Sequence, residues 1–427
     1  MSGLRTVMAM GAIAISVMSL SPGALGSRTA IGREEGSRST DLAYALVSAR
    51  DGKLVVAGLS THKGRTLALA RYTRGGELDR SFGTGGRVLT PFGARTDAGA
   101  KSVAIAPSGE IVAGGYGYVH SRTVSDFVLA RYTAGGQLDG TFGQGGKLVT
   151  RAGSGVQALA LQRDGKVVAV GASYDWRFVL VRYTPLGALD RSFGRSGKVV
   201  TDFGARSRSS AKAITIQPNG KIVVAGSTFR GTKTNFAVAR YNVDGTLDRS
   251  FGSSGRVVTE VGEGFSEASA LVIQPDRKLV VAGTGALVRY AADGQLDPGF
   301  GVEGIAVTNA GSPSAVAIQR DHKLVAAGAH RGGRTGYVAF SLTRFLEDGT
   351  IDETFGRRGS VRTEISTQAA ANAVLVRADG KIVAAGTAGG RDFALARYTP
   401  GGRLDSSFGS RGKVLTDFGS AWATRGS

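Results

Sequence analysis

Arginine and aspartate recur in this chain at one fixed spacing, eight residues apart. The seven pairs are Arg71 and Asp79, Arg131 and Asp139, Arg182 and Asp190, Arg240 and Asp248, Arg289 and Asp297, Arg344 and Asp352, and Arg397 and Asp405. Such a carboxylate could bind a cation, but one per repeat supplies too few oxygens for calcium. We therefore interpret the pairs as structural: each Asp contacts its Arg across a turn, or orders that turn by accepting backbone N–H bonds. The Phe three residues after each Asp is expected to fill an apolar gap between repeats.

A polar residue also stands at one position of every repeat, seven residues before a recurring Asp turn or its equivalent. The set is Tyr44, Lys101, Gln157, Lys212, Ser269, Ser314 and Asn372. Because an apolar strand follows each, we expect a polar ring at the mouth of a central channel. The ring offers two lysines but no carboxylate and no histidine, the ligands that a catalytic metal would need. We interpret it as hydrated channel lining, with a small-anion site as the alternative and no metal.

Connecting segments of variable length hold a third group of candidates, His62, Tyr118, His120, Trp176 and His330. The three histidines come from different repeats, and none has a second ligand two to four residues away. We therefore expect exposed histidines rather than a metal site. Trp176 could stack on a sugar, or it could cover the edge of a repeat.

Motifs for catalysis and cofactors are missing from the sequence. It has no G-x-S-x-G nucleophile elbow, no phosphate-binding G-x-x-x-x-G-K-[ST] loop and no H-E-x-x-H zinc pair. It also has no cysteine, which excludes disulfides, thiolate catalysis and cysteine-ligated metals. We expect no cofactor.

Two motifs alternate seven times along the chain and indicate its architecture. The first is a turn between apolar runs: Asp51-Gly52-Lys53, Ser108-Gly109-Glu110, Asp164-Gly165-Lys166, Asn219-Gly220-Lys221, Asp276-Arg277-Lys278, Asp321-His322-Lys323 and Asp379-Gly380-Lys381. The second runs from Arg-Tyr through Leu-Asp to Phe-Gly, and its Phe residues are Phe82, Phe142, Phe193, Phe251, Phe300, Phe355 and Phe408. The period is about 55 residues, somewhat above that of typical four-stranded propeller repeats.

Each period carries four strand signals, which in the third repeat lie at 157–162, 166–171, 178–183 and 198–203. They are short, rich in Val, Leu and Ile, and bounded by Gly or Asp turns. The Asp-Gly and Asn-Gly steps supply the positive φ that two-residue hairpins need. No helical periodicity is present, so we predict an all-β fold: a seven-bladed β-propeller of four-stranded antiparallel blades.

The two motifs resemble the delta-60 repeat of bacterial exported proteins, over residues 41–419. The resemblance implies a β-propeller and a bacterial surface or secreted setting, and it implies no activity. Repeats five and six depart from the pattern. Arg277 and His322 replace the turn glycine, and Phe345 replaces the Tyr of Arg-Tyr, which puts local turn geometry in doubt but not the fold.

The repeats divide into a constant half and a variable half. The Asp-Gly-Lys and Leu-Asp turns barely change in length and should share one face of the propeller. The other connections, on the opposite face, differ by up to eleven residues between repeats. Variable loops on a rigid scaffold commonly form binding sites, so we expect the site on this variable-loop face.

The first residues read as an export signal, with Arg5, an apolar run over 7–20, Pro22 and an acceptable cleavage site at residues 24–26. We divide the chain into a signal peptide (1–26), an N-terminal segment (27–40), the propeller (41–420) and a tail (421–427). The mature chain should be extracellular or periplasmic, monomeric and without a membrane span. The formal net charge of +20 favours anionic partners, although the basic residues form no long run.

These observations predict an exported, non-catalytic β-propeller that binds a macromolecular or anionic polymer partner through its variable-loop face. A cell-wall polymer or glycan fits better than nucleic acid, because no aromatic–basic interleaving is visible. The alternative is a propeller enzyme of the lactonase or lyase type, with a metal at the channel mouth.

Overall fold

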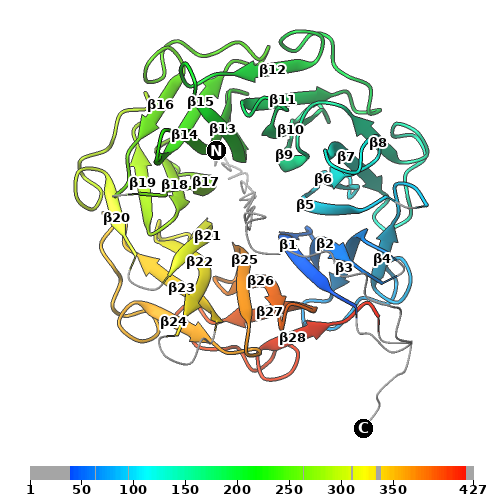
Figure 1. The fold of residues 1–427 in the computed structure, drawn as a ribbon. Coiled ribbons are helices and arrows are strands. Elements are labelled where there is room, and N and C mark those ends of the chain that lie inside the picture. The colour runs from blue at the N-terminus through cyan, green and yellow to red at the C-terminus, as the bar shows by residue number, and fades with distance from the viewer. Residues whose placement is uncertain are drawn as a thin grey trace, which may run out of the picture.

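The computed structural model describes residues 39–419 except 63, 95, 263, 309–310 and 333–337. The predicted signal peptide, most of the N-terminal segment and the predicted tail lie outside the described residues. The described part contains seven four-stranded sheets and no helix, so none that could span a membrane. Each sheet is built from four consecutive strands paired antiparallel, and the sheets stand around a central axis as the blades of a propeller (Figure 1). The predicted fold class is confirmed.

Strands at the same position of each blade are equivalent, and blades 1 to 7 are numbered in chain order. The innermost strands are β1(Asp41–Ser48), β5(Ala98–Ile105), β9(Val156–Leu161), β13(Arg208–Ile216), β17(Ala268–Ile273), β21(Ser312–Ile318) and β25(Ala369–Val376). The second strands are β2(Leu54–Ser60), β6(Ile111–Gly117), β10(Val167–Ala172), β14(Ile222–Arg230), β18(Leu279–Gly283), β22(Leu324–Arg331) and β26(Ile382–Ala388). The third strands are β3(Thr66–Tyr72), β7(Asp126–Tyr132), β11(Phe178–Tyr183), β15(Lys233–Tyr241), β19(Ala286–Tyr290), β23(Val338–Phe345) and β27(Asp392–Tyr398). The outer strands are β4(Arg87–Thr90), β8(Lys147–Thr150), β12(Lys198–Thr201), β16(Arg256–Thr259), β20(Ile305–Val307), β24(Ser360–Thr363) and β28(Lys413–Thr416).

The hydrophobic core is a ring of seven interfaces rather than one centre. Each of the seven apolar clusters joins residues of two neighbouring blades, and each contains the Phe of a Phe-Gly step. Second and third strands are covered on both faces, which explains why their sequences are continuous apolar runs without alternation. The prediction that the repeated Phe fills the gap between blades is confirmed.

The turn between the first and second strands differs from our prediction. In blade 1 the Ala49 N–H donates to the Lys53 carbonyl at 2.8 Å, and the Gly52 N–H donates to the Ala49 carbonyl at 2.9 Å. Three residues therefore form the loop, a turn followed by a residue in the left-handed region, and the expected two-residue hairpin was wrong. Arg277 and His322 adopt the same conformation, with φ of 73° and 65°, so the missing glycines leave the turn intact.

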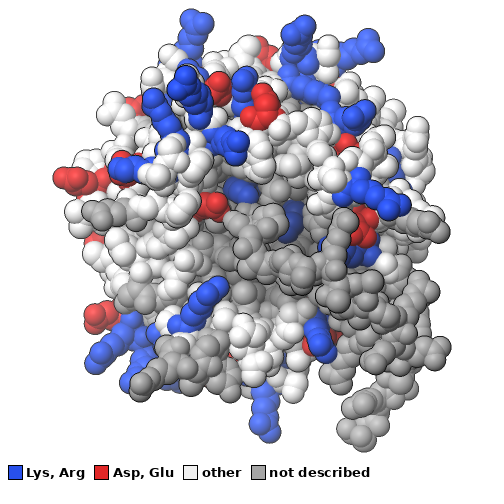
Figure 2. Space-filling view, in the orientation of Figure 1, with Lys and Arg blue, Asp and Glu red and all other residues white. Residues whose placement is uncertain are grey.

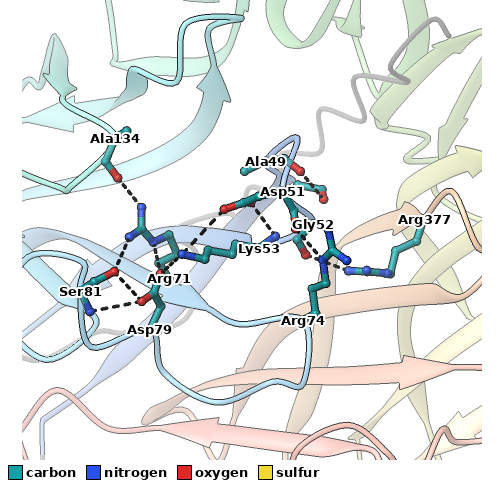
Figure 3. Close-up of polar contacts among 11 residues, drawn as sticks. Ala49, Asp51, Gly52, Lys53, Arg71, Arg74, Asp79, Ser81, Ala134 and Arg377 are labelled. Atoms are coloured by element: carbon teal, nitrogen blue, oxygen red, sulfur yellow. Dashed lines mark hydrogen bonds and ion pairs between the residues drawn. The ribbon is translucent and has the colours of Figure 1, made fainter.

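The seven Arg–Asp pairs are confirmed, with Nε to Oδ2 distances of 2.6–2.8 Å. In blade 1, Arg71 also donates to the Ala134 carbonyl of blade 2, while Asp79 accepts from the Ser81 hydroxyl at 2.7 Å (Figure 3). The Lys53 ammonium lies 2.9 Å from the same Asp79 carboxylate. Each Arg thus links its own turn to the next blade, as a scaffold element.

The ring closes by side-by-side packing of blades 7 and 1, without exchange of a strand among the described residues. Arg397 donates to the Arg74 carbonyl, as each Arg does to the following blade. The Tyr72 hydroxyl donates to Thr416 at 2.8 Å across the same seam, and β1 lies beside β25, β26 and β27 (Figure 1).

Candidate functional site

The seven polar residues predicted at the channel mouth share one backbone position. Each is the extra residue of a β-bulge in the innermost strand: its two chain neighbours pair with consecutive residues of the second strand, and it pairs with none. The bulged residues are Tyr44, Lys101, Gln157, Lys212, Ser269, Ser314 and Asn372. A bulge re-aims a side chain and increases the local twist. The polar residue that recurs in the sequence therefore occupies the bulge position of each innermost strand.

The bulge explains the glycine that ends each Val-Val-Ala-Gly run. At Gly58 an added Cβ would lie 1.9 Å from the Leu42 carbonyl oxygen, and at Gly226 it would lie 2.1 Å from that of Ser210. The equivalent glycines of the other blades meet the innermost strand at 1.8–2.3 Å. These glycines are needed for close approach of two backbones, not for a positive φ.

Neighbouring blades bring some of these bulged residues into contact. The Lys101 Nζ atom lies 3.3 Å from the centroid of the Tyr44 ring, a cation–π contact across the interface of blades 1 and 2. The Asn372 Nδ2 atom donates to the Ala43 carbonyl at 2.7 Å across the seam of blades 7 and 1. The Gln157 Oε1 atom is buried and accepts no hydrogen bond from the described residues.

Lys101 and Lys212 lie close enough for the charge of Lys212 to act on Lys101. Burial, followed by the charge of Lys212, lowers the pKa of Lys101 to about 7. Burial also lowers the pKa of Lys212, although the charge of Glu267 opposes it. Among the described residues no carboxylate forms an ion pair with Lys101. An anion in this channel would relieve the repulsion between the two ammonium groups.

The five loop-face candidates lie on four different blades and do not converge. His62 and Tyr118 follow the second strands of blades 1 and 2 and are half-buried, and His120 is exposed. His330 lies within β22, not in a loop as the sequence suggested. Trp176 is half exposed, at a turn where its φ is 58°.

One polar contact on this face was missed by the sequence reasoning. Asp126, the first residue of β7, is buried and accepts hydrogen bonds from two blades. The His120 Nδ1 atom lies 2.9 Å from its Oδ2, and the Tyr174 hydroxyl of blade 3 donates to its Oδ1 at 3.1 Å. Its only signal in the sequence is its place immediately before the first apolar residue of a third strand.

Aromatic side chains, three of them exposed and Phe229 half-buried, cross the face from blade 3 to blade 4, and we call Tyr174, Trp176, Phe229 and Phe265 the aromatic track. The Trp176 carbonyl accepts from the Ser209 N–H at 2.6 Å, which places this turn beside β13. Phe229 stacks on Phe265, with ring centroids 6.4 Å apart and an angle of 4° between the planes. Phe265 is 71% exposed, and Tyr174 is also exposed.

Basic residues accompany the aromatic track. Four exposed arginines flank it along the chain, Arg177, Arg206, Arg208 and Arg230. Figure 2 shows Lys and Arg spread over this face of the molecule with fewer Asp and Glu among them, and basic atoms also lie inside the central hollow. A separate groove, of about 510 Å³, lies elsewhere, between the outer strand of blade 4 and the turn after the third strand of blade 5, beside Arg256 and Leu296.

The described residues bring together one group of three acidic side chains that could hold a metal ion. It consists of Asp41, Asp392 and Asp417 and lies at the seam between blades 7 and 1. It was not predicted, because the three residues are far apart in the sequence.

Six segments of the chain match the family described as "Domain of unknown function (DUF5122) beta-propeller": residues 49–82, 106–142, 162–193, 217–251, 274–300 and 377–408. Each segment runs from the first turn of a repeat to its Phe-Gly step. The repeat of blade 6, with His322 and Phe345, is not among them. The matches support a repeat-based β-propeller family, and the name delta-60 stays a resemblance. No curated protein matches the chain.

Solved structures with a similar fold have diverse roles. One is a catalytically inactive virginiamycin B lyase from Staphylococcus aureus with quinupristin (13% identity, 86% of this chain and 84% of that chain, TM-score 0.39). Others are Sqt1 from Chaetomium thermophilum (10%, 86% and 83%, 0.46) and the BP39L lectin from Burkholderia pseudomallei (10%, 86% and 98%, 0.45). Such likenesses concern the fold and do not separate a binding protein from an enzyme.

Proposed function

We propose that this protein is an exported, non-catalytic β-propeller that binds an acidic glycan or cell-wall polymer through its variable-loop face. The observation that carries the proposal is the aromatic track with its flanking arginines. An exposed aromatic ring offers a flat apolar surface to the face of a sugar. A guanidinium group nearby offers paired donors to a carboxylate.

The channel mouth supports the same ligand chemistry. We expect Lys101 and Lys212 to place positive charge at the axis, where a carboxylate of the polymer would accept hydrogen bonds from two ammonium groups. The net charge of +20 would also speed the approach of a polyanion. Export agrees with the N-terminal sequence and with a partner outside the cytoplasm, and it is part of the proposal.

The test uses a defined probe, polygalacturonate, with neutral dextran as the comparison. We expect calorimetric titration at about 150 mM salt, near the physiological Debye length, to show binding of polygalacturonate only. Trp176→Ala should weaken it about tenfold, a loss of about 1.4 kcal/mol. The matched control is Leu186→Ala, which truncates another exposed apolar side chain, in a turn on the opposite face. Absence of binding, or equal loss in both variants, would refute this site.

A pH series separates the channel from the aromatic track. Because the pKa of Lys101 lies at about 7, its ammonium is gained as the pH falls from 8 to 6. Binding should strengthen over that interval in the wild type, and less so in Lys101→Met. A pH response that is unchanged in Lys101→Met would show that the channel takes no part.

A further inference from the structure

The seam between blades 7 and 1 brings three carboxylates together. Asp41 is the first residue of β1, Asp392 is the first residue of β27, and Asp417 directly follows β28. One oxygen from each lies within 4.8 Å of the others. The Ser39 hydroxyl adds a fourth oxygen, 2.9 Å from Asp41 Oδ2 and 2.8 Å from Asp417 Oδ1.

The other blades show that this acidity is specific to the seam. By strand register, Arg177 and Asp202 of blade 3 stand where Asp392 and Asp417 stand in blade 7, because Phe178 pairs with Thr201 as Phe393 pairs with Thr416. The two blade-3 residues have opposite charges and lie 3.9 Å apart. In blade 2 the corresponding residues are Asp126 and Arg151, again an acid with a base. Blade 7 alone has an acid at both positions, and blade 1 adds a third.

Asp41 provides an observation independent of this clustering. It is fully buried, and its Oδ1 atom accepts no hydrogen bond from the described residues. Burial raises the pKa of the Asp41 carboxyl above its usual range, and the Ser60 hydroxyl, which opposes this, does not meet hydrogen-bond geometry with Oδ1. Its other oxygen, Oδ2, accepts the Phe418 N–H at 2.7 Å. An ionised carboxylate with a buried, unsatisfied oxygen is costly unless a cation or a further donor completes it.

We propose that Asp41, Asp392 and Asp417, with the Ser39 hydroxyl oxygen, bind a calcium ion at the seam. Calcium takes six to eight oxygen ligands and accepts carboxylates, hydroxyls and water in flexible geometry. Oxygen donors without histidine or cysteine do not suit zinc or copper. The ion links the start of blade 1 to two strands of blade 7, at the point where no described strand is exchanged between the ends of the ring. The site is separate from the aromatic track and does not depend on the proposed function.

The test is calcium titration of the full mature chain after treatment with EDTA. We expect one calcium ion per chain, with a dissociation constant of about 0.1–1 mM, the range of extracellular calcium modules. A concentration of 10 mM should raise the thermal midpoint by about 2 °C. Asp392→Asn and Asp417→Asn should weaken calcium binding at least tenfold. The matched control is Asp202→Asn, the same position as Asp417 in blade 3, and it should bind as the wild type does.

Two results would overturn the proposal. One is a wild-type midpoint and calorimetric signal that do not respond to calcium up to 10 mM. The other is calcium binding that Asp392→Asn and Asp202→Asn leave equally intact.

Discussion

Asp190→Asn tests whether the repeated Arg–Asp pair stabilises the propeller. Arg182 is almost fully buried, and its Nε atom donates to Asp190 Oδ2 at 2.8 Å. The second oxygen of Asp190 accepts from the Ser192 hydroxyl at 2.7 Å, and Lys166 Nζ lies 3.2 Å from Oδ2. The substitution keeps the shape of the side chain and removes its charge, so it leaves a buried guanidinium without its counter-ion.

The pKa of Asp190 gives the size of its contribution to the free energy of unfolding. Burial alone would raise it, but hydrogen bonds from Ser192 and the charges of Lys166 and Arg182 outweigh burial and lower it from 3.8 to about 2. One pKa unit corresponds to about 1.4 kcal/mol, so the ionised carboxylate contributes about 2 kcal/mol above pH 4. This contribution is lost as the pH falls from about 4 towards 2. The unfolded chain takes up a proton at this group near pH 4, whereas the folded protein takes it up only at lower pH. We expect Asp190→Asn to cost about 1–3 kcal/mol at pH 7.

The assay is urea unfolding of the wild type and two variants, followed by tryptophan fluorescence at pH 7 and between pH 4 and 2.5. Asp164→Asn is the control: it removes the same charge from the same blade, at a side chain that is 53% exposed and 3.3 Å from Lys166. An exposed pair of this kind is worth about 0–1 kcal/mol. Equal midpoints for the two variants at pH 7 would refute the reasoning. So would a gap between the wild type and Asp190→Asn that does not narrow towards pH 2.5.

Three further predictions concern stability and use the same assay. Gly226→Ala should cost about 3 kcal/mol or more, because its Cβ would meet a backbone oxygen, whereas Gly140→Ala, with open space around it, should change little. Phe345→Tyr should be neutral or stabilising by up to about 1 kcal/mol, because the Thr308 hydroxyl, which donates to the Gly311 carbonyl, can still accept from the new Tyr hydroxyl. Glu110→Lys should stabilise blade 2 by about 0.2–1 kcal/mol, since the other six blades place a lysine there against the Asp of the pair. A loss of several kcal/mol with Phe345→Tyr, or a loss with Glu110→Lys, would contradict the corresponding idea.

The repeat sequence predicted the fold because the interactions that define a blade are local. Arg182 and Asp190 are joined by one turn, so their spacing cannot vary without breaking the ion pair. Apolar runs separated by Gly and Asp turns likewise fix four strands per repeat. Seven copies of such a unit were enough to predict the architecture. The loop between the first and second strands is nevertheless one residue longer than predicted.

Contacts between blades were visible in the sequence only as unexplained departures. Five further tyrosines form, as Tyr72 does, a hydroxyl–hydroxyl hydrogen bond with the outer-strand Thr of the preceding blade: Tyr132, Tyr183, Tyr241, Tyr290 and Tyr398. Phe345 lacks this hydroxyl, and the Thr at the corresponding position of blade 5, Thr308, donates instead to the Gly311 carbonyl at 2.6 Å. The departure in blade 6 thus leaves the Thr of blade 5 with a different partner, and only the three-dimensional structure reveals this change.

The repeated Arg–Asp pairs, the most regular feature of the sequence, are therefore part of the scaffold, as their spacing indicated. What the sequence determined by itself was every feature whose partners lie within one repeat, because short loops hold such partners at fixed distances. Tertiary structure decided the rest: the bulge that turns seven polar residues, the aromatic track across blades 3 and 4, and the three carboxylates of the seam. Asp41 and Asp417 stand at opposite ends of the propeller sequence, and only closure of the ring makes them neighbours.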